Sequence, residues 1–189
     1  MNSTKIIAQL AETPVVAAVK DAAGLARCLA SNAPVVFVLH GSIVDIADTV
    51  GQIHKAGKAA IVHIDLIDGL APREVAVDYI AQTTKADGII STKPALVKHA
   101  KATGLVAIRR FFLLDSLALQ SLEKQLTPDA ADFIEILPGC MPKIIQKIVI
   151  KTTIPVIAGG LISDKEDVVS ALNAGATAVS STNPAVWNL

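Results

Sequence analysis

Short apolar runs rich in β-branched residues recur along the chain, and each precedes a polar turn and a stretch with helical periodicity. The runs do not alternate with polar residues, which is typical of parallel strands buried on both faces. They begin near eight positions: Val15, Val35, Ala60, Gly88, Leu105, Phe133, Pro155 and Ala176. Eight such units predict an α/β fold, a compact (β/α)8 TIM-like barrel, with residues 1–189 as a single barrel domain. Because such barrels typically have about 250 residues, a doubly wound open sheet is the alternative.

Capping residues agree with this reading of the helices. Ser42 with Asp45 resembles an N-cap with an acidic first turn, and Ser163 with Glu166 resembles a capping box. Asn183 followed by Pro184 predicts a further helix start near the C-terminus. Glycines stand just before three predicted strands, where helices commonly end: Gly57, Gly104 and Gly175.

The composition indicates a folded, soluble protein. The chain is 52% hydrophobic and 3% aromatic, which excludes disorder. Its 17 basic and 17 acidic residues give zero formal net charge, which argues against a basic nucleic-acid coat. Two cysteines form neither a disulfide framework nor a zinc motif. Since neither a signal peptide nor a bilayer-length apolar run is present, we expect a cytoplasmic protein without a membrane segment.

Polar residues gather where the predicted strands end, which is where barrels carry their functional groups. These segments are 40–41, 63–69, 91–93, 109–110, 135–139, 158–160 and 180–183. The last two are the most specific, because the loops after the seventh and eighth strands of barrels often hold a phosphate. Gly159 and Gly160 would allow backbone N–H groups to approach an anion, and Ser181 and Thr182 would supply hydroxyls. A helix starting near Pro184 would add its dipole, although a tight structural turn is the alternative.

Five charged or imidazole side chains at strand ends are candidate ligand contacts: His63, Asp65, Lys93, Arg110 and Glu135. Residues 63 and 65 would leave the same face of a strand. Their spacing also occurs in metal-binding pentulose-phosphate epimerases, and His40 could join them. The seventh strand offers no further aspartate, so we expect hydroxyl contacts or a structural pair rather than a metal. The lysine is a candidate for a Schiff base or, more commonly, for neutralising an anion. The arginine fits the same anion with its fork geometry.

Basic residues are unevenly distributed despite the zero total. Residues 85–110 contain six basic residues against Asp87 alone, and three lysines follow at i, i+4 and i+8 on a predicted helix. Such stripes either contact RNA phosphates or are solvated helix faces. The candidate RNA contacts are Lys98, Lys101, Lys143, Lys147 and Lys151. The four phenylalanines (Phe37, Phe111, Phe112 and Phe133) are expected in the core, so they predict no base-stacking platform.

Several segments, in order and without a large insertion, resemble the glycerol-3-phosphate-responsive antiterminators of glycerol uptake operons. They are HIDLIDGL (63–70), DGIISTK (87–93), FFLLDSLAL (111–119), DFIEILPG (132–139), IAGGLI (157–162), KEDV (165–168) and NAGATAVSSTNPAVW (173–187). The resemblance extends from about residue 14 to the C-terminus. Two positions depart from it, since Arg109 stands where glutamine is expected and Cys140 where an aliphatic residue is expected.

The resemblance implies a barrel without enzymatic activity or cofactor. Its effector would be glycerol 3-phosphate, and its partner the leader mRNA of a glycerol catabolism operon. The protein would prevent premature termination and stabilise the message. The positions implied for ligand recognition are His63, Asp65, Lys93, Arg110, Glu135, Gly159, Gly160, Ser181 and Thr182. A barrel enzyme acting on a small phosphorylated polyol or sugar, epimerase- or aldolase-like, is the alternative. A ligand sensor without RNA binding is a third possibility, and a homo-oligomer is compatible with each.

Overall fold

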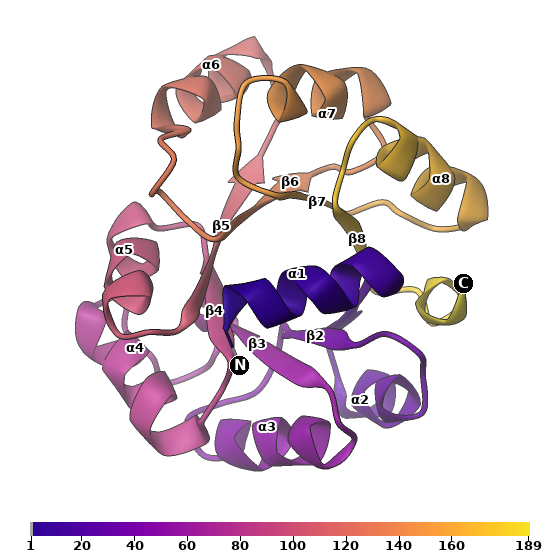
Figure 1. The fold of residues 1–189 in the computed structure, drawn as a ribbon. Coiled ribbons are helices and arrows are strands. Elements are labelled where there is room, and N and C mark those ends of the chain that lie inside the picture. Colours follow the sequence, from indigo (N-terminus) through magenta and orange to yellow (C-terminus); the bar gives the residue numbers. More distant parts are fainter. Residues whose placement is uncertain (1) are drawn as a thin grey trace.

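The computed structural model describes residues 2–189 and shows a closed barrel of eight parallel strands, each paired with its neighbours in sequence (Figure 1). The strands are β1 (Val15–Val19), β2 (Val35–Val38), β3 (Ala59–His63), β4 (Gly88–Ser91), β5 (Val106–Phe112), β6 (Phe133–Leu137), β7 (Val156–Gly159) and β8 (Ala178–Ser181). The barrel closes through the pairing of β1 with β8. The predicted barrel is therefore confirmed, and the open-sheet alternative is wrong.

Helices surround the barrel, as Figure 1 shows. They are α1 (Ser3–Glu12), α2 (Ala22–Leu29), α3 (Ile46–Lys55), α4 (Glu74–Tyr79), α5 (Pro94–Ala102), α6 (Ser116–Gln125), α7 (Pro142–Val149) and α8 (Lys165–Asn173). Shorter helical segments are η1 (Ile64–Leu66), η2 (Ile80–Thr84) and η3 (Val186–Asn188). Three turn glycines have positive φ just after α3, α5 and α8, as expected: Gly57, Gly104 and Gly175.

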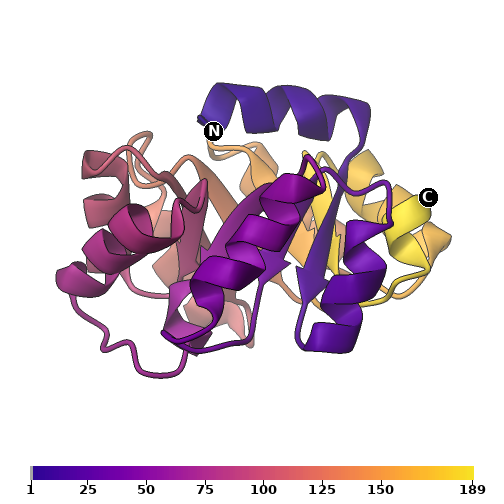
Figure 2. The ribbon, with the colours of Figure 1, turned by 90° about the horizontal axis from the view of Figure 1, so that it is seen from below.

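Helix α1 precedes the first strand and lies across one end of the barrel (Figures 1 and 2), an element that the strand pattern did not predict. Asn2 caps it, since its Oδ1 accepts a hydrogen bond of 3.0 Å from the Lys5 N–H. Ile6 and Leu10 lie one turn apart and are each only 1% exposed, because they pack on the interior of the barrel. The helix thus closes the end where the strands begin.

The barrel interior is filled by alternate residues of the strands. Apolar side chains such as Phe37, Ile61 and Phe133 form this interior cluster, and a separate, larger cluster lies between the strands and several of the helices. Toward the carboxyl ends of the strands the interior becomes polar: His63, Arg110, Glu135 and Ser180 are all buried there. Because α1 closes the opposite end, this polar layer faces the mouth of the barrel.

The predicted caps are shifted along the chain. Helix α3 begins after Asp45, whose carboxylate accepts hydrogen bonds from the N–H and hydroxyl of Ser42, at 2.6 Å and 3.0 Å. Helix α8 is capped by Asp164, which accepts from the Asp167 N–H at 2.9 Å. Asp167 in turn accepts from the N–H and hydroxyl of Ser163. The start of α8 is therefore capped as predicted in kind, but Asp164 is the N-cap and Asp167, not Glu166, accepts from Ser163.

Two predictions about helices are wrong. The chain after β8 forms only the three-residue 3-10 turn η3 instead of a helix starting near Pro184, so no helix dipole supports the expected phosphate site. This turn is fixed by Trp187, which is buried and donates from its indole nitrogen to the Ser181 carbonyl at 2.7 Å. Helix α7 ends at Val149, so Lys151 lies beyond it and does not continue a helical stripe.

Candidate functional site

A pocket of about 340 Å³ opens at the carboxyl ends of β5 to β8. The turns after β7 and β8 both line it, through Gly160, Ser181 and Thr182. Arg110 and Glu135 line the same pocket from β5 and β6. The sequence predicted that these two turns would meet, and the structure places them beside one arginine.

Gly159 and Gly160 serve different purposes in the turn after β7. A Cβ atom on Gly159 would lie 2.5 Å from both the Glu135 Oε1 and the Ser180 Oγ atoms. The missing side chain therefore makes room for a buried hydrogen bond, and Gly159 itself does not line the pocket. Gly160 has φ +73°, a conformation that glycine adopts readily, and Leu161 follows it with φ +61°. Of the two glycines, Gly160 is thus the one that shapes the pocket wall.

The two hydroxyl residues after β8 also differ. Ser181 is buried, and its Oγ donates to the Ile162 carbonyl at 2.6 Å and accepts from the Asn183 N–H at 3.0 Å. Asn183 also donates from its side-chain amide to the Ser163 carbonyl at 2.7 Å. These bonds tie the loop after β8 to the loop after β7. Ser181 is therefore already engaged, whereas Thr182 is exposed and its hydroxyl has no hydrogen-bond partner among residues 2–189.

Arg110 and Glu135 form a buried ion pair at the floor of the pocket. The Arg110 Nε donates to the Glu135 Oε2, and the Ser180 hydroxyl donates to Oε1 at 2.6 Å. Arg110 is 8% exposed and Glu135 is fully buried. Both carboxylate oxygens are thus occupied, so Glu135 holds the arginine rather than offering a free acceptor. The terminal nitrogens of Arg110 have no hydrogen-bond partner in the described part of the chain, which leaves them available to an anion.

His63 is a neutral, buried imidazole in the same polar layer. Its side chain is 2% exposed, and burial lowers its pKa from 6.5 to about 4, with a further lowering from the positive charge of Arg110. Its Nδ1 atom is buried and has no partner among the residues described. Because the ring is neutral near pH 7, it can donate or accept a hydrogen bond without adding charge.

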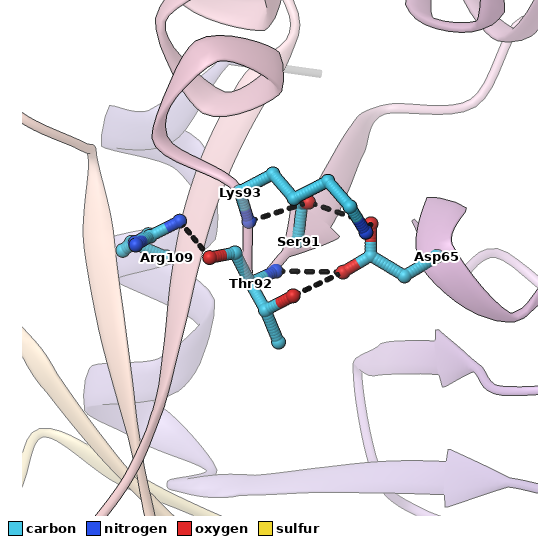
Figure 3. A network of polar contacts seen from close by, with 5 residues as sticks. All are labelled: Asp65, Ser91, Thr92, Lys93 and Arg109. Atoms are coloured by element: carbon cyan, nitrogen blue, oxygen red, sulfur yellow. Dashed lines mark hydrogen bonds and ion pairs between the residues drawn. The ribbon is translucent and has the colours of Figure 1, made fainter. Parts of the chain in front are cut away.

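Asp65 is the centre of a network that joins the ends of β3 and β4 (Figure 3). Its carboxylate accepts from the Ser91 hydroxyl at 2.8 Å, from the Thr92 N–H and hydroxyl at 2.7 Å and 2.8 Å, and from the Lys93 Nζ at 3.2 Å. Burial raises the pKa of Asp65, but these hydrogen bonds outweigh it and leave the pKa below its ordinary value.

The arrangement corrects the expected relation between positions 63 and 65. Strand β3 ends at His63, and Asp65 lies in the 3-10 turn η1, so the two do not share one strand face. Asp65 turns toward the segment after β4 and positions Lys93, whose side chain is 43% exposed. The residues predicted for the site thus form two groups, a β5–β8 pocket around Arg110 and a β3–β4 cluster around Asp65. The cluster residues do not line the pocket, but the charges of both Arg110 and Lys93 act on His63.

The five candidate RNA-contacting lysines are spread over two sides of the barrel. Lys98 is exposed on α5, and the Lys101 Nζ lies 3.9 Å from the Asp132 Oδ1. Lys143 and Lys147 are exposed on α7. Lys151 donates to the Glu123 Oε1 at 2.6 Å, which partly neutralises it.

Two further observations concern metals and membranes. Among residues 2–189, no three His, Cys, Asp or Glu side chains gather as a metal site would require. No helix in the described part of the chain is long and apolar enough to span a bilayer. His40, which the sequence offered as a further metal ligand, has a buried Nε2 atom without a hydrogen-bond partner among the described residues.

Two pocket residues, Ser180 and Asn183, lie in the predicted segment 180–183 but were not among the named ligand contacts. Ser180 points inward because side chains alternate along β8, so the register of the strand was the signal that could have found it. Asn183 was interpreted as a helix cap, but it contacts the neighbouring loop instead.

The closed parallel barrel and the polar pocket at the ends of its last strands define a (β/α)8-barrel protein whose pocket lies where barrels often hold a phosphate. A family model described as glycerol-3-phosphate responsive antiterminator matches residues 15–187. The chain belongs to this family.

Individual relatives agree with the family assignment. The chain is 44% identical over 180 residues to "Uncharacterized protein YgcP" of Escherichia coli (strain K12), covering 95% of this chain and 94% of that protein. A crystal structure of a glycerol uptake operon antiterminator regulatory protein from Listeria monocytogenes superposes with a TM-score of 0.88 at 31% identity, covering 93% of this chain and 95% of that one. An antiterminator-related protein from Thermotoga maritima gives 0.79 at 31% identity, covering 92% and 96%.

Enzymes share the architecture as well. A structure named "QR15, an Aldolase" superposes with a TM-score of 0.71 at 16% identity, covering 93% of this chain and 92% of that one. At this level of identity the likeness concerns the fold alone, because barrels host many unrelated functions.

Proposed function

We propose that this protein is a transcription antiterminator that responds to glycerol 3-phosphate and binds the leader mRNA of a glycerol catabolism operon. It would act in the cytoplasm, preventing premature termination and stabilising the message. Membership of the antiterminator family supports this proposal. One observation supports glycerol 3-phosphate as the ligand. The buried Arg110 guanidinium has unused terminal nitrogens beside the turns after β7 and β8.

The proposed ligand places its phosphate against Arg110, with the backbone near Gly160 and the hydroxyl of Thr182 completing the contacts. Arginine recognises phosphate oxygens through two parallel N–H donors, which a lysine cannot reproduce. The glycerol hydroxyls extend toward His63, since the carboxylates of Asp65 and Glu135 already accept hydrogen bonds from protein groups. Lys93 adds positive charge from the neighbouring cluster.

A response to the ligand requires two conformations that bind it with different affinity. The loops after β7 and β8 are joined by Ser181 and Asn183, so a phosphate contacting one loop also affects the other. RNA that prefers the ligand-bound conformation is then bound more tightly. Coupling between sites is typically about 1–3 kcal/mol, or roughly 5–150-fold in affinity.

The test is the affinity for the operon's 5′ leader transcript, measured with and without glycerol 3-phosphate across a series of salt concentrations. We expect glycerol 3-phosphate, but not glycerol, to tighten binding within that range. We also expect the logarithm of the affinity to fall linearly with the logarithm of salt concentration. Equal affinities with and without the ligand would contradict the proposal.

A matched variant isolates the pocket. Arg110→Lys keeps the charge but loses the fork, so we expect at least a tenfold loss of affinity for glycerol 3-phosphate by calorimetry. Unliganded binding to the leader transcript should be retained. Thermal stabilisation of the wild-type protein by glycerol 3-phosphate without any RNA binding would indicate a ligand sensor instead.

The neutral imidazole of His63 favours a second candidate, an enzyme acting on a small phosphorylated polyol or sugar. A neutral histidine with a lowered pKa can polarise a substrate oxygen by donating a hydrogen bond, and His63 lies in the same polar layer as Arg110. Turnover of sugar phosphates by the purified protein, lost in His63→Gln, would support this activity. The absence of turnover across a broad set of such substrates would exclude it.

A further inference from the structure

A second hollow, of about 420 Å³, lies on the outside of the barrel between α5 and α6, away from the β5–β8 pocket. Arg109 and Phe111 line its inner wall from β5, and Pro94 and Lys98 line one side from α5. Gln125 and three residues of the loop after α6 complete it: Thr127, Asp129 and Ala130. Figure 1 shows α5 and α6 standing apart on either side of β5. We call this hollow the α5–α6 groove.

Arg109 is held in a fixed orientation at the inner wall of the groove. One terminal nitrogen donates to the Thr92 carbonyl, and the other donates to the Gln125 Oε1 at 3.3 Å. The carbon at the centre of its guanidinium lies 5.1 Å from the centroid of the Phe111 ring. Phe111 and Phe112 were expected in the core, but Phe111 is only partly buried and forms part of the groove, and Phe112 is 50% exposed. The groove therefore presents a planar cation and an aromatic ring together.

The lining of the groove carries two basic side chains, Arg109 and Lys98, against one acidic side chain, so its charge is positive. Lys98 is exposed at the edge of the groove. Asp129 is the acidic residue in the lining, and Lys101 outside it is partly neutralised by Asp132. An anionic occupant with a flat ring matches this combination of charge and shape.

We infer that the α5–α6 groove binds a nucleotide of single-stranded RNA. The base stacks against the Arg109 guanidinium and the Phe111 ring, and a phosphate contacts Lys98. Unstacked bases of single-stranded RNA are recognised in this way on aromatic rings and arginine planes. The inference rests on the proposed function, for which it identifies the surface that contacts the leader transcript.

The groove is also connected to the β3–β4 cluster around Asp65 through Thr92 (Figure 3). The Thr92 carbonyl accepts from Arg109, while its N–H and hydroxyl donate to Asp65. Asp65 also accepts from Lys93. The segment after β4 therefore contacts the β3–β4 cluster on one side and Arg109 on the other. A ligand that draws Lys93 away from Asp65 would alter the anchor of Arg109, which provides a physical route for the response.

The test measures binding of a fluorescently labelled leader transcript to five variants of the full chain. Arg109→Lys keeps the charge but loses the planar fork, and Phe111→Leu removes the ring. We expect each to weaken binding at least fivefold, since base stacking contributes about 1–3 kcal/mol. Lys98→Ala should lower the salt slope by about 0.7, the value for one phosphate contact on a single strand. Lys55→Ala, at an exposed position on α3, should bind as the wild type does.

Folding is checked by calorimetry with glycerol 3-phosphate, which all five variants should bind with wild-type affinity. If a variant at the inner wall fails to fold, the test rests on Lys98→Ala at its exposed position, through the salt dependence of transcript binding. Wild-type affinity for the transcript in Arg109→Lys and Phe111→Leu would overturn the inference, as would an equal loss in Lys143→Ala on α7. A wild-type protein that binds no leader transcript would contradict both the inference and the proposed function. Wild-type binding that is insensitive to glycerol 3-phosphate would contradict the proposed function alone.

Discussion

At the scale of single residues, the pocket depends on a chain of contacts that fixes one arginine. Ser180 and Arg110 occupy the two oxygens of Glu135, and Gly159 leaves the space in which they meet. Removing one partner of a buried ion pair typically costs about 3–5 kcal/mol, because the remaining charge is left without compensation. The sequence indicated these residue types at the strand ends, but it could not distinguish a ligand contact from a residue that holds another residue in place.

Replacing Gly159 tests this arrangement without changing any charge. In Gly159→Ala the new Cβ would lie 2.5 Å from Glu135 and Ser180, which forces a buried pair apart. We expect the free energy of unfolding to fall by about 1–3 kcal/mol, measured by urea denaturation. Gly51→Ala is the matched control, since nothing lies within 4 Å of its Cβ position on α3, and it should raise stability by about 0.5–1 kcal/mol. Equal effects of the two variants would contradict this role of Gly159.

The buried imidazole of His63 makes stability depend on pH. Its pKa is about 4 in the folded protein against 6.5 when unperturbed, so the unfolded chain binds the proton more readily between these values. We therefore expect the free energy of unfolding to fall as the pH drops from 6.5 to about 4, by about 3 kcal/mol from this residue. The His63→Gln variant lacks the titrating imidazole, so its free energy of unfolding lacks this dependence on pH. Parallel stability curves for the wild type and His63→Gln over this pH range would show that burial of His63 does not perturb its titration.

At the scale of elements, strands were easier to predict than helices and turns. A strand of this barrel is buried on both faces, so the burial appears in the sequence as an unbroken apolar run. Helix α1 has no such run, and its burial depends on the barrel end that it covers. The segment after β8 carries a cap residue and a proline, yet the burial of Trp187 holds it as a 3-10 turn. Tertiary contacts decided these cases, and local sequence does not contain them.

The turn after β4 is held by the carboxylate of Asp65, which accepts hydrogen bonds from three residues. Asp65→Asn removes the charge and one of the two acceptor oxygens that hold Thr92, Ser91 and Lys93. We expect amide hydrogen exchange at Thr92 to accelerate at least tenfold by NMR, since losing a hydrogen bond to a charged group typically costs about 1.5–3 kcal/mol. Asp68→Asn, at an exposed position nearby, is the control and should leave exchange unchanged. Unaltered exchange at Thr92 in Asp65→Asn would indicate that the turn is held by other contacts.

At the scale of the whole molecule, strand order brings the last two strands beside β5 and β6 and so assembles the pocket. The sequence therefore predicted the meeting of Gly160, Ser181 and Thr182 from topology alone. It did not predict the α5–α6 groove, because Arg109 and Phe111 form it only through the separation of two helices. The formal net charge of zero also gives no indication that Arg109 and Lys98 meet in the lining of this groove.

A crystal structure of the protein with bound glycerol 3-phosphate tests the proposed ligand site most directly. We predict phosphate density within hydrogen-bond distance of the terminal nitrogens of Arg110 and beside the turns at Gly160 and Thr182, with the glycerol hydroxyls directed toward His63. A phosphate bound elsewhere, whether against Lys93 alone or in the α5–α6 groove, or a pocket that stays empty at saturating ligand, would contradict it.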